Sequence, residues 1–334
     1  RGHHLIVCGS AQRLMQGLVL DRTAPLYGRA TEVLKVRPLL AGWIVEGLGC
    51  HGIDAIEAYA VWGGVPRYWE LAKDYPDLTA AAKSLILAPL GVLHDEPTTL
   101  LLDDLKDSSQ ASSILQLVGL GCHRLSEIAA RMSKPSGELG RPLQRLLELE
   151  LLTKETPFGC SEKDSKRTLY RVADPFLTFW FRYVATHRSW LAQDIVEPVW
   201  SKIQGDFTTH VANIWEVLSR QSVPLLKLWG QSWSPAKRWW GTGARRLPLE
   251  VDLVANNLED THLLVGSVKW QRKADFARWI QELQHQTKEL TIVEGRTVHL
   301  AIFCQVSPKR TEKLLCQKAG VEVVTPDQVL SALR

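Results

Sequence analysis

The sequence lacks the features that mark membrane proteins, disulfide-linked proteins and small zinc proteins. No apolar run reaches the roughly 18 to 20 residues that a membrane-spanning helix needs, because the longest candidate, residues 85–93, is broken by Pro89 and Gly91. The six cysteines form no Cys-x-x-Cys pair, and none has a histidine partner at zinc-site spacing. We therefore expect no membrane span, no structural zinc and reduced thiols, as in a cytoplasmic protein.

Two further absences concern the front of the chain and nucleotide binding. The sequence begins Arg1-Gly2-His3-His4, without an initiator methionine or a secretory signal, so we interpret its front as truncated. It contains no Gly-x-x-x-x-Gly-Lys-Ser/Thr loop and no apolar strand that ends in paired acids able to hold Mg²⁺. This predicts that the chain has no complete ATP site and binds neither ATP nor Mg²⁺ tightly.

What the sequence does contain is typical of a folded α/β protein with several domains. Hydrophobic residues make up 45% and charged residues 23% of the sequence, as in ordinary folded proteins. A chain of 334 residues is too long for a single hydrophobic core. The formal net charge is only +4, and the basic side chains gather towards the C-terminal portions. This bias is compatible with a polyanionic partner, but an ordinary basic surface is the commoner explanation.

Residues 1–105 read as the end of an α/β unit followed by helices. The apolar run from Leu5 to Ser10 predicts a buried strand of a parallel sheet, residues 11–20 a helix, and residues 31–36 a second strand. From residue 39 the pattern becomes helical. It is interrupted at Gly63-Gly64-Val65-Pro66, where the glycines end one helix and the proline begins the next.

Residues 109–172 have the element order of a winged helix-turn-helix. Helices are expected at 113–120, 124–132 and 137–149, and strands at 151–155 and 168–172, with the loop at 158–167 as the wing. DNA contacts are predicted for basic residues of the third helix and the wing, namely Arg141, Arg145, Lys163, Lys166 and Arg167. Winged helices also serve as protein-docking modules, so a protein partner stays open. The aromatic run at 174–183 is interpreted as core.

The last part predicts a mixed sheet flanked by helices, and its first two strands carry the strongest chemical pattern. Glu250 and Asp252 lie two apart on the strand 250–255, and Ser267 and Lys269 lie two apart on the strand 262–270, so each pair should share a face. Metal-dependent nucleases hold Mg²⁺ with acidic residues on such a hairpin and use a lysine beside them. Here a serine stands at the second acidic position.

These two strands resemble the terminal domain of archaeal-type predicted ATPases, which is itself similar to the PD-(D/E)XK nuclease fold. The resemblance implies that Asp252 is the motif aspartate and weak metal ligand, that Lys269 is the motif lysine, and that Ser267 replaces the usual glutamate. It also places an additional acid at Glu216. Because a hydroxyl removes one anionic ligand, we expect no cleavage unless Glu250 substitutes. The alternative is that Asp252 and Lys269 form a structural pair in an inactive fold.

The resemblance extends to AAA+ ATPases over the earlier part of the chain. It implies that Ser10 lies near a γ-phosphate and that Arg29, in Tyr27-Gly28-Arg29, serves a neighbouring nucleotide as a finger, the alternative being an ordinary surface arginine. Gly63 to Pro66 matches the turn of the helical lid, and residues 174–182 match the segment after the winged helix. The intact parent is then expected to bind ATP and Mg²⁺ and to be able to form oligomers through its AAA+ part.

The expected architecture is therefore α/β multidomain, with four parts in order: 1–38, the remnant of the AAA+ core; 39–105, a helical lid; 106–185, the winged helix; and 186–334, the PD-(D/E)XK nuclease-like domain. The expected function is that of the C-terminal portion of a AAA+ ATP-binding protein, with a winged helix that contacts DNA and an inactive nuclease-like domain. The alternative is a non-catalytic module that binds protein partners.

Overall fold

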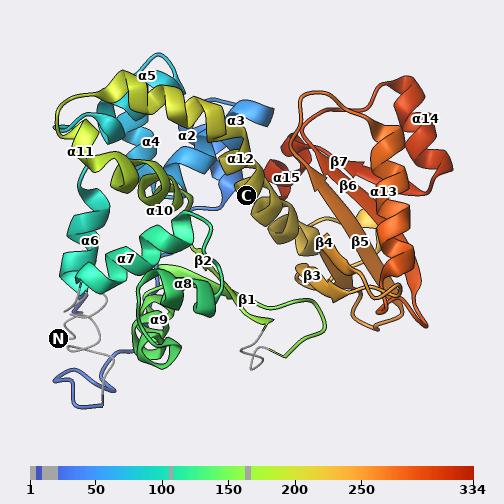
Figure 1. Cartoon of the computed structure of the whole chain (residues 1–334), viewed down its shortest axis with the longest axis horizontal. Helices are drawn as coiled ribbons and strands as arrows, with labels where there is room; N and C mark the ends of the chain where they lie inside the picture. Colours follow the sequence, from blue (N-terminus) through green and yellow to red (C-terminus); the bar gives the residue numbers. More distant parts are fainter. Residues whose placement is uncertain (1–4, 10–21, 105–107, 162–166) are drawn as a thin grey trace, which may run out of the picture.

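The computed structural model describes residues 5–9, 22–104, 108–161 and 167–334, and shows a helical part joined to a sheet-containing part (Figure 1). The helical part precedes a single long helix, α12, that leads into the sheet. Its helices are η2 Ala41–Trp43, α2 Ile44–Leu48, α3 Gly52–Trp62, α4 Pro66–Ala72, α5 Leu78–Ala82, η3 Lys83–Leu87, α6 Glu96–Asp104, α7 Ser108–Gly119, α8 Leu125–Arg131, η4 Ser136–Leu139, α9 Gly140–Glu148, α10 Pro175–Phe179, η6 Trp180–Val184, η7 Ala185–His187 and α11 Arg188–Leu191.

The predicted break between two helices is confirmed at Gly63. This glycine ends α3 with a φ of 61°, and a Cβ placed on it would come within 2.7 Å of the Asp174 carboxylate, so only glycine fits. Pro66 then occupies the first turn of α4, where its missing N–H costs nothing. The Trp69 indole N–H donates to the Gly63 carbonyl at 2.9 Å and fixes the turn.

The segment from α7 to the second strand follows the predicted order of three helices and two strands. Strands β1 Leu152–Glu155 and β2 Leu169–Val172 pair antiparallel, with Leu152 opposite Val172 and Glu155 opposite Leu169. The three helices close on a core formed by buried aliphatic side chains of α7, α8, η4 and α9, namely Ile114, Leu115, Ile128, Leu139, Leu143 and Leu146. The helix starts differ by a few residues from those expected.

The aromatic run after β2 forms core, as the sequence predicted. Phe176, Phe179 and Phe181 are all at most 1% exposed, and Trp180 donates its indole N–H to the His94 carbonyl at 2.7 Å. Asp174 caps α10 by accepting from the Leu177 amide at 3.0 Å. The aromatic run at 174–183 therefore connects the winged-helix-like segment to the core of the other helices.

The sheet-containing part begins with the 27-residue helix α12 Val196–Ser222. Its remaining elements are η8 Val223–Leu225, η9 Leu228–Gly230, β3 Lys237–Thr242, β4 Pro248–Asn256, β5 His262–Lys269, α13 Phe276–Glu289, β6 Thr297–Cys304, α14 Arg310–Lys318, β7 Val321–Val324 and α15 Pro326–Ala332. The five strands lie in sequence order, antiparallel from β3 to β5 and parallel from β5 to β7. The expected mixed sheet is thus present, with β3 as an additional strand.

Helices cover both faces of this sheet (Figure 1). On one face, α12 and α15 pack against side chains such as Leu253, Leu264 and Phe303, in a core that is continuous with the helical part. On the other face, α13 and α14 enclose a separate core around Val254, Val265 and Trp279. The C-terminal helix α15 also contacts η2, where the Gly42 amide donates to the Leu333 carbonyl at 2.9 Å, so that the two parts of the chain are tied together.

The two strands expected near the front of the chain are wrong. Residues 5–9 and 31–36 are in neither helix nor strand, and Leu5 and Ile6 are 78% and 88% exposed. A buried parallel strand needs neighbouring strands, and the two sheets found in the described part of the chain are formed by β1–β2 and β3–β7 alone. The expected helix at residues 11–20 lies outside the described residues.

The helix hydropathy, the cysteines and the grouping of possible metal ligands in the described residues bear on what the sequence lacks. No helix in the described ranges combines the length and hydropathy that crossing a bilayer requires. All six cysteines are free, and the described His, Cys, Asp and Glu residues nowhere gather in a group of three or more that could hold a metal ion.

Candidate functional site

The candidate site lies where the hairpin strands β4 and β5 meet, and Asp252 is its centre. The Asp252 carboxylate accepts a hydrogen bond from the Val268 amide at 2.8 Å and one from the Ser267 hydroxyl at 3.3 Å, both on β5. Ser267 is 3% exposed. Strand periodicity and the hairpin correctly bring Ser267 and Asp252 together, and the carboxylate satisfies a backbone donor that would otherwise be left unpaired.

A bulge in β4 separates Asp252 from Glu250. Val254 lies opposite Lys237 and Val251 opposite Trp239, so β4 contains one residue more than β3 over this stretch. The extra residue interrupts the alternation on which a shared face for Glu250 and Asp252 was predicted. The prediction that Glu250 and Asp252 act together on one face is therefore wrong, because the two carboxylates bind different partners. Glu250 pairs with Arg238 of β3, and Asp252 accepts hydrogen bonds from β5.

Lys269 is directed to a helix instead of to Asp252. Its ammonium lies 3.5 Å from the Glu282 carboxylate on α13, and Glu282 also accepts from Arg278 at 2.7 Å. Hydrogen bonding from Arg278, followed by the charge of Lys269, holds the pKa of Glu282 below its ordinary value although burial opposes the shift. The expected pair between Asp252 and Lys269 is therefore replaced by a pair between Lys269 and Glu282.

Glu216 belongs to a network of ion pairs beneath β4. Its carboxylate lies 3.6 Å from Arg220, one turn along α12, and Arg220 donates to the Asp252 carbonyl at 3.1 Å. The buried Arg220 also lies 3.6 Å from Glu155 of β1. Burial lowers the pKa of Arg220, and Glu155 and Glu216 counteract that shift.

Glu155 links this network to the winged-helix-like segment. It pairs with Arg171 of β2 at 2.8 Å and with Arg238 of β3 at 3.7 Å, in addition to Arg220. Burial alone would raise the pKa of Glu155, but the three guanidinium groups together lower it. Acidic and basic groups alternate from β1 through α12 to β4, so the charges beside Asp252 neutralise one another.

This arrangement leaves Asp252 without a second carboxylate. Glu250 and Glu216 are engaged by arginines, Ser267 presents a neutral hydroxyl, and Lys269 is held by α13. A Mg²⁺ site needs several oxygen ligands facing one point, usually including carboxylates. Asp252 instead acts as a hydrogen-bond acceptor that joins the ends of two strands.

The residues expected to contact DNA fall into three groups. Arg141 is exposed at the start of α9, whereas Arg145 lies 3.5 Å from Glu148. Arg167 donates to the Trp240 carbonyl of β3 and to Cys160 Sγ at 3.3 Å, so its guanidinium is held against the sheet. Lys163 and Lys166 lie outside the described residues.

The loop expected to be a wing is attached to the edge strand β3. Besides Arg167, the Phe158 amide donates to the Arg238 carbonyl at 2.7 Å, and the Phe158 side chain packs on the core beneath α13. An uncovered edge strand invites pairing with other chains, and these contacts cover part of the β3 edge. The described ends of this loop therefore face the sheet.

Sequence reasoning missed two cations that precede Arg141 by ten residues or fewer in the chain. Arg131 at the end of α8 and Lys134 in the turn that follows are exposed, and no described acidic side chain forms an ion pair with either. In a helix-turn-helix the end of the second helix, the turn and the start of the third helix lie on one side, which was the signal available in the sequence. Glu282 and Arg238 were also missed.

Of the two residues related to nucleotide by resemblance, only one is described. Ser10 lies outside the described residues. Arg29 is exposed in an irregular segment, directly after the turn in which its amide donates to the Leu26 carbonyl at 3.1 Å.

Comparisons with known proteins add a family and a distant relative. A family model described as archaeal and bacterial proteins of unknown function matches residues 180–288, which run from the aromatic segment to the end of α13. An uncharacterised protein of Methanocaldococcus jannaschii is 28% identical over 296 residues, which cover 85% of this chain and 64% of the relative. The chain thus spans about two thirds of the length of that relative.

Solved structures give only weak likenesses. Can2 from Sulfobacillus thermosulfidooxidans, solved with cyclic tetra-adenylate, is 12% identical with a TM-score of 0.27 over 72% of this chain and 54% of its own. Protein VC1899 from Vibrio cholerae is 11% identical with a TM-score of 0.26 over 67% of this chain and 55% of its own. Likenesses this low do not bear on the site.

Proposed function

We propose that the chain is the DNA-contacting portion of a AAA+-type ATPase, and that its sheet domain keeps the frame of a PD-(D/E)XK nuclease without the cutting site. The observation that carries the second half is the contact between Ser267 and Asp252. A hydroxyl occupies the place of the second metal-binding carboxylate and donates to the one carboxylate that is present, at 3.3 Å. A nuclease of this type depends on an ion clamp, and this site offers one carboxylate for it.

DNA contact is supported by the exposed cations Arg131, Lys134 and Arg141 on the winged-helix-like segment. They cover the end of α8, the turn and the start of α9, which are the parts of a helix-turn-helix that approach a duplex. Arg167 contributes less than the sequence suggested, because β3 already binds its guanidinium. We therefore place the contact surface on the end of α8, the turn and the start of α9.

The ATPase part of the proposal concerns the parent. It is supported by the resemblance of the Arg29 segment and of the Gly63 turn to AAA+ ATPases. The uncharacterised relative is longer than the part that this chain matches, which is 64% of it. In that parent ATP and Mg²⁺ bind outside the matched region, and Arg29, exposed on an irregular segment, is free to reach a neighbouring subunit.

A second candidate function is a non-catalytic protein-docking module. The observation that favours it is the attachment of the described ends of the loop to β3 through Phe158 and Arg167, which turns those ends towards the sheet. In this alternative the winged helix and the sheet domain form one rigid body that presents its surface to a protein partner.

The lack of cleavage is tested by restoring the missing carboxylate. The native chain is compared with Ser267→Glu and with the double variant Ser267→Glu/Asp252→Ala on plasmid and single-stranded DNA with Mn²⁺. We expect no cleavage by the native chain, and weak cleavage by Ser267→Glu that the second substitution abolishes, because a glutamate there supplies a second oxygen ligand.

Two controls separate the effect of the new carboxylate from effects of misfolding and of side-chain size. Circular dichroism shows whether the buried glutamate is tolerated, and Ser267→Gln supplies the same bulk without the charge. Robust Mn²⁺-dependent cleavage by the native chain that disappears in Asp252→Ala contradicts the proposal directly, whatever the behaviour of Ser267→Glu.

A further inference from the structure

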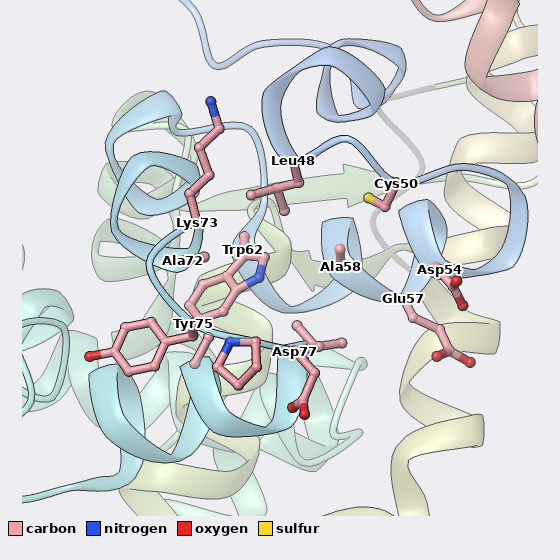
Figure 2. A pocket seen from close by; sticks show the side chains of 13 residues that line it. Leu48, Cys50, Asp54, Glu57, Ala58, Trp62, Ala72, Lys73, Tyr75 and Asp77 are labelled. Carbon is pink, nitrogen blue, oxygen red and sulfur yellow. The ribbon is translucent and has the colours of Figure 1, made fainter.

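The helical part contains a pocket that the proposed function does not use. It has a volume of about 490 Å³ and lies between α2, α3, α4 and α5, with walls that include Leu48, Ala58, Trp62 and Leu78 (Figure 2). Pockets that hold small molecules in proteins have volumes of roughly 300–1,000 Å³. The apolar walls and the size are therefore suited to a ligand rather than to a few water molecules.

The charge in this pocket is strongly one-sided. Three carboxylates line it, those of Asp54, Glu57 and Asp77, and its one lysine, Lys73, extends away from them (Figure 2). Burial raises the pKa of Glu57, the nearby charge of Asp54 raises it further, and Arg272 partly opposes the shift. Two carboxylates in a half-buried site repel each other, and a bound cation relieves that repulsion.

An indole N–H without a hydrogen-bond partner among the described residues points into the same space. Trp62 is 1% exposed, and its indole nitrogen is turned towards the side of the pocket where Asp54 and Glu57 lie (Figure 2). None of the described residues accepts a hydrogen bond from this N–H, although the neighbouring Trp69 indole is paired with the Gly63 carbonyl. This nitrogen keeps some solvent exposure, so a ligand in the pocket can supply the acceptor that the protein does not.

We propose that this pocket binds an organic cation of the arginine or lysine type, whose charged group lies between Asp54 and Glu57 and whose carbonyl oxygen accepts from the Trp62 indole. The aliphatic stem of such a ligand packs on Leu48 and Leu78. Long basic side chains combine an apolar stem with a charged head, which matches the division of this pocket into apolar walls and an acidic side.

The same chemistry occurs in a free amino acid and in a side chain of a peptide, and calorimetry with two probes separates these sources. L-arginine represents the free amino acid, and N-acetyl-L-arginine methylamide represents a residue within a peptide. The matched neutral probe is N-acetyl-L-citrulline methylamide, which has the same shape without the charge. Agmatine supplies the guanidinium without the carbonyl.

We expect saturable binding of at least one arginine probe and no measurable binding of the citrulline probe. Glu57→Gln should weaken the arginine probe about tenfold, which corresponds to one charge-assisted hydrogen bond. Trp62→Phe should weaken the arginine probe and leave agmatine unchanged, since only the carbonyl uses the indole N–H. Glu294→Gln, on an exposed loop outside the pocket, is the control and should bind like the native chain.

Because Trp62 belongs to the core and its replacement can impair folding, the native chain provides a second measurement. Cys50 lines the pocket, so a bound ligand should slow its alkylation, followed by mass spectrometry with Cys122 as an internal reference. Equal binding of the arginine and citrulline probes overturns the proposal. So does millimolar arginine probe that neither produces saturable heat nor protects Cys50.

Discussion

Glu155 makes more ion pairs than any other described acidic side chain of the winged-helix-like segment, although it belongs to a strand of four residues. Arg171, Arg220 and Arg238 surround it at 2.8 to 3.7 Å and come from three different elements. Removing one partner from a buried charge network leaves the others uncompensated, which costs much more than the loss of an exposed pair. This residue therefore fixes how β1 sits on α12 and β3.

We predict that Glu155→Gln lowers the free energy of unfolding by roughly 3–5 kcal/mol, measured by urea denaturation at pH 7. The matched control is Glu150→Gln, whose exposed pair with Lys35 at 2.6 Å should contribute no more than about 1 kcal/mol. Because the pKa of Glu155 is lowered in the folded protein, its contribution is present above the ordinary pKa and is lost on acidification. Equal effects of the two substitutions would show that the network is not stabilising.

The sequence allowed part of the candidate site to be predicted, and the limits have physical causes. The contact between Ser267 and Asp252 follows from strand periodicity and a short hairpin, both of which are local. The partner of Lys269 is Glu282, on a helix whose packing direction depends on the whole sheet. The bulge at Asp252 exists because β3 pairs there, and β3 itself carried no clear alternation.

At the scale of the elements, the helices α3, α10 and α12 are held together by two buried titratable groups. Asp174 caps α10, and burial raises its pKa to about 6 against the opposing hydrogen bonds from Leu177 and Phe176. His210 of α12 contacts the Ala60 carbonyl at 2.8 Å, and burial lowers its pKa to about 4. These groups respond to acid in opposite directions.

Acidification changes the stability of the folded protein in opposite directions at Asp174 and at His210. The folded protein keeps a proton on Asp174 at a pH where the unfolded chain has released it, so acidification from pH 7 towards 4 gains stability from this group. The unfolded chain protonates His210 near its ordinary pKa of 6.5, before the folded protein does, so the same acidification loses stability there. In the native protein the two contributions largely cancel over this range.

We predict that Asp174→Asn reveals the contribution of His210. Between pH 7 and 4.5 the variant should lose about 2 kcal/mol more stability than the native chain, because the compensating gain from Asp174 is gone. Asparagine keeps the helix cap, so the variant should be at least as stable as the native chain at pH 7. Parallel pH dependences of the two proteins, measured by thermal or urea unfolding, would contradict the assignment.

The elements could be predicted where their signals were local and dense. The break at Gly63 and Pro66 followed from the glycine and the proline. The strands expected at residues 5–10 and 31–36 were wrong over the described residues, since an apolar run indicates a buried strand only where a neighbouring strand is present to pair with it. Helix α12 carries Pro198 in its first turn, where proline is tolerated.

At the scale of the whole molecule, the helical part and the sheet domain form one connected body. The network around Glu155, the loop attached to β3 and the return of α15 to η2 all join them. Contact between DNA and the helix-turn-helix face is therefore expected to be carried by a rigid platform rather than by a flexibly linked module.

Nucleotide binding gives one prediction at this scale. Since the sequence has no phosphate-binding loop and no pair of acids that could hold Mg²⁺, titration of this chain with ATP and Mg²⁺ should give no saturable heat. Saturable binding with a dissociation constant in the micromolar range would mean that nucleotide binds to residues other than those expected from the resemblance.

The central claim is that this chain contacts DNA through the face formed by Arg131, Lys134 and Arg141, and the salt dependence of its DNA affinity tests that claim most directly. Fluorescence anisotropy with a duplex at a series of salt concentrations gives the slope of log affinity against log salt for the native chain and for the triple alanine variant. A control variant carries alanine at Arg310, Lys313 and Lys318, which are equally exposed on α14.

We predict that the native chain and the α14 control bind with the same steep slope, and that the triple variant loses roughly one unit of slope for each phosphate contact removed. Unchanged affinity and slope in the triple variant, or no DNA binding by the native chain at low salt, would contradict the account and favour the protein-docking alternative.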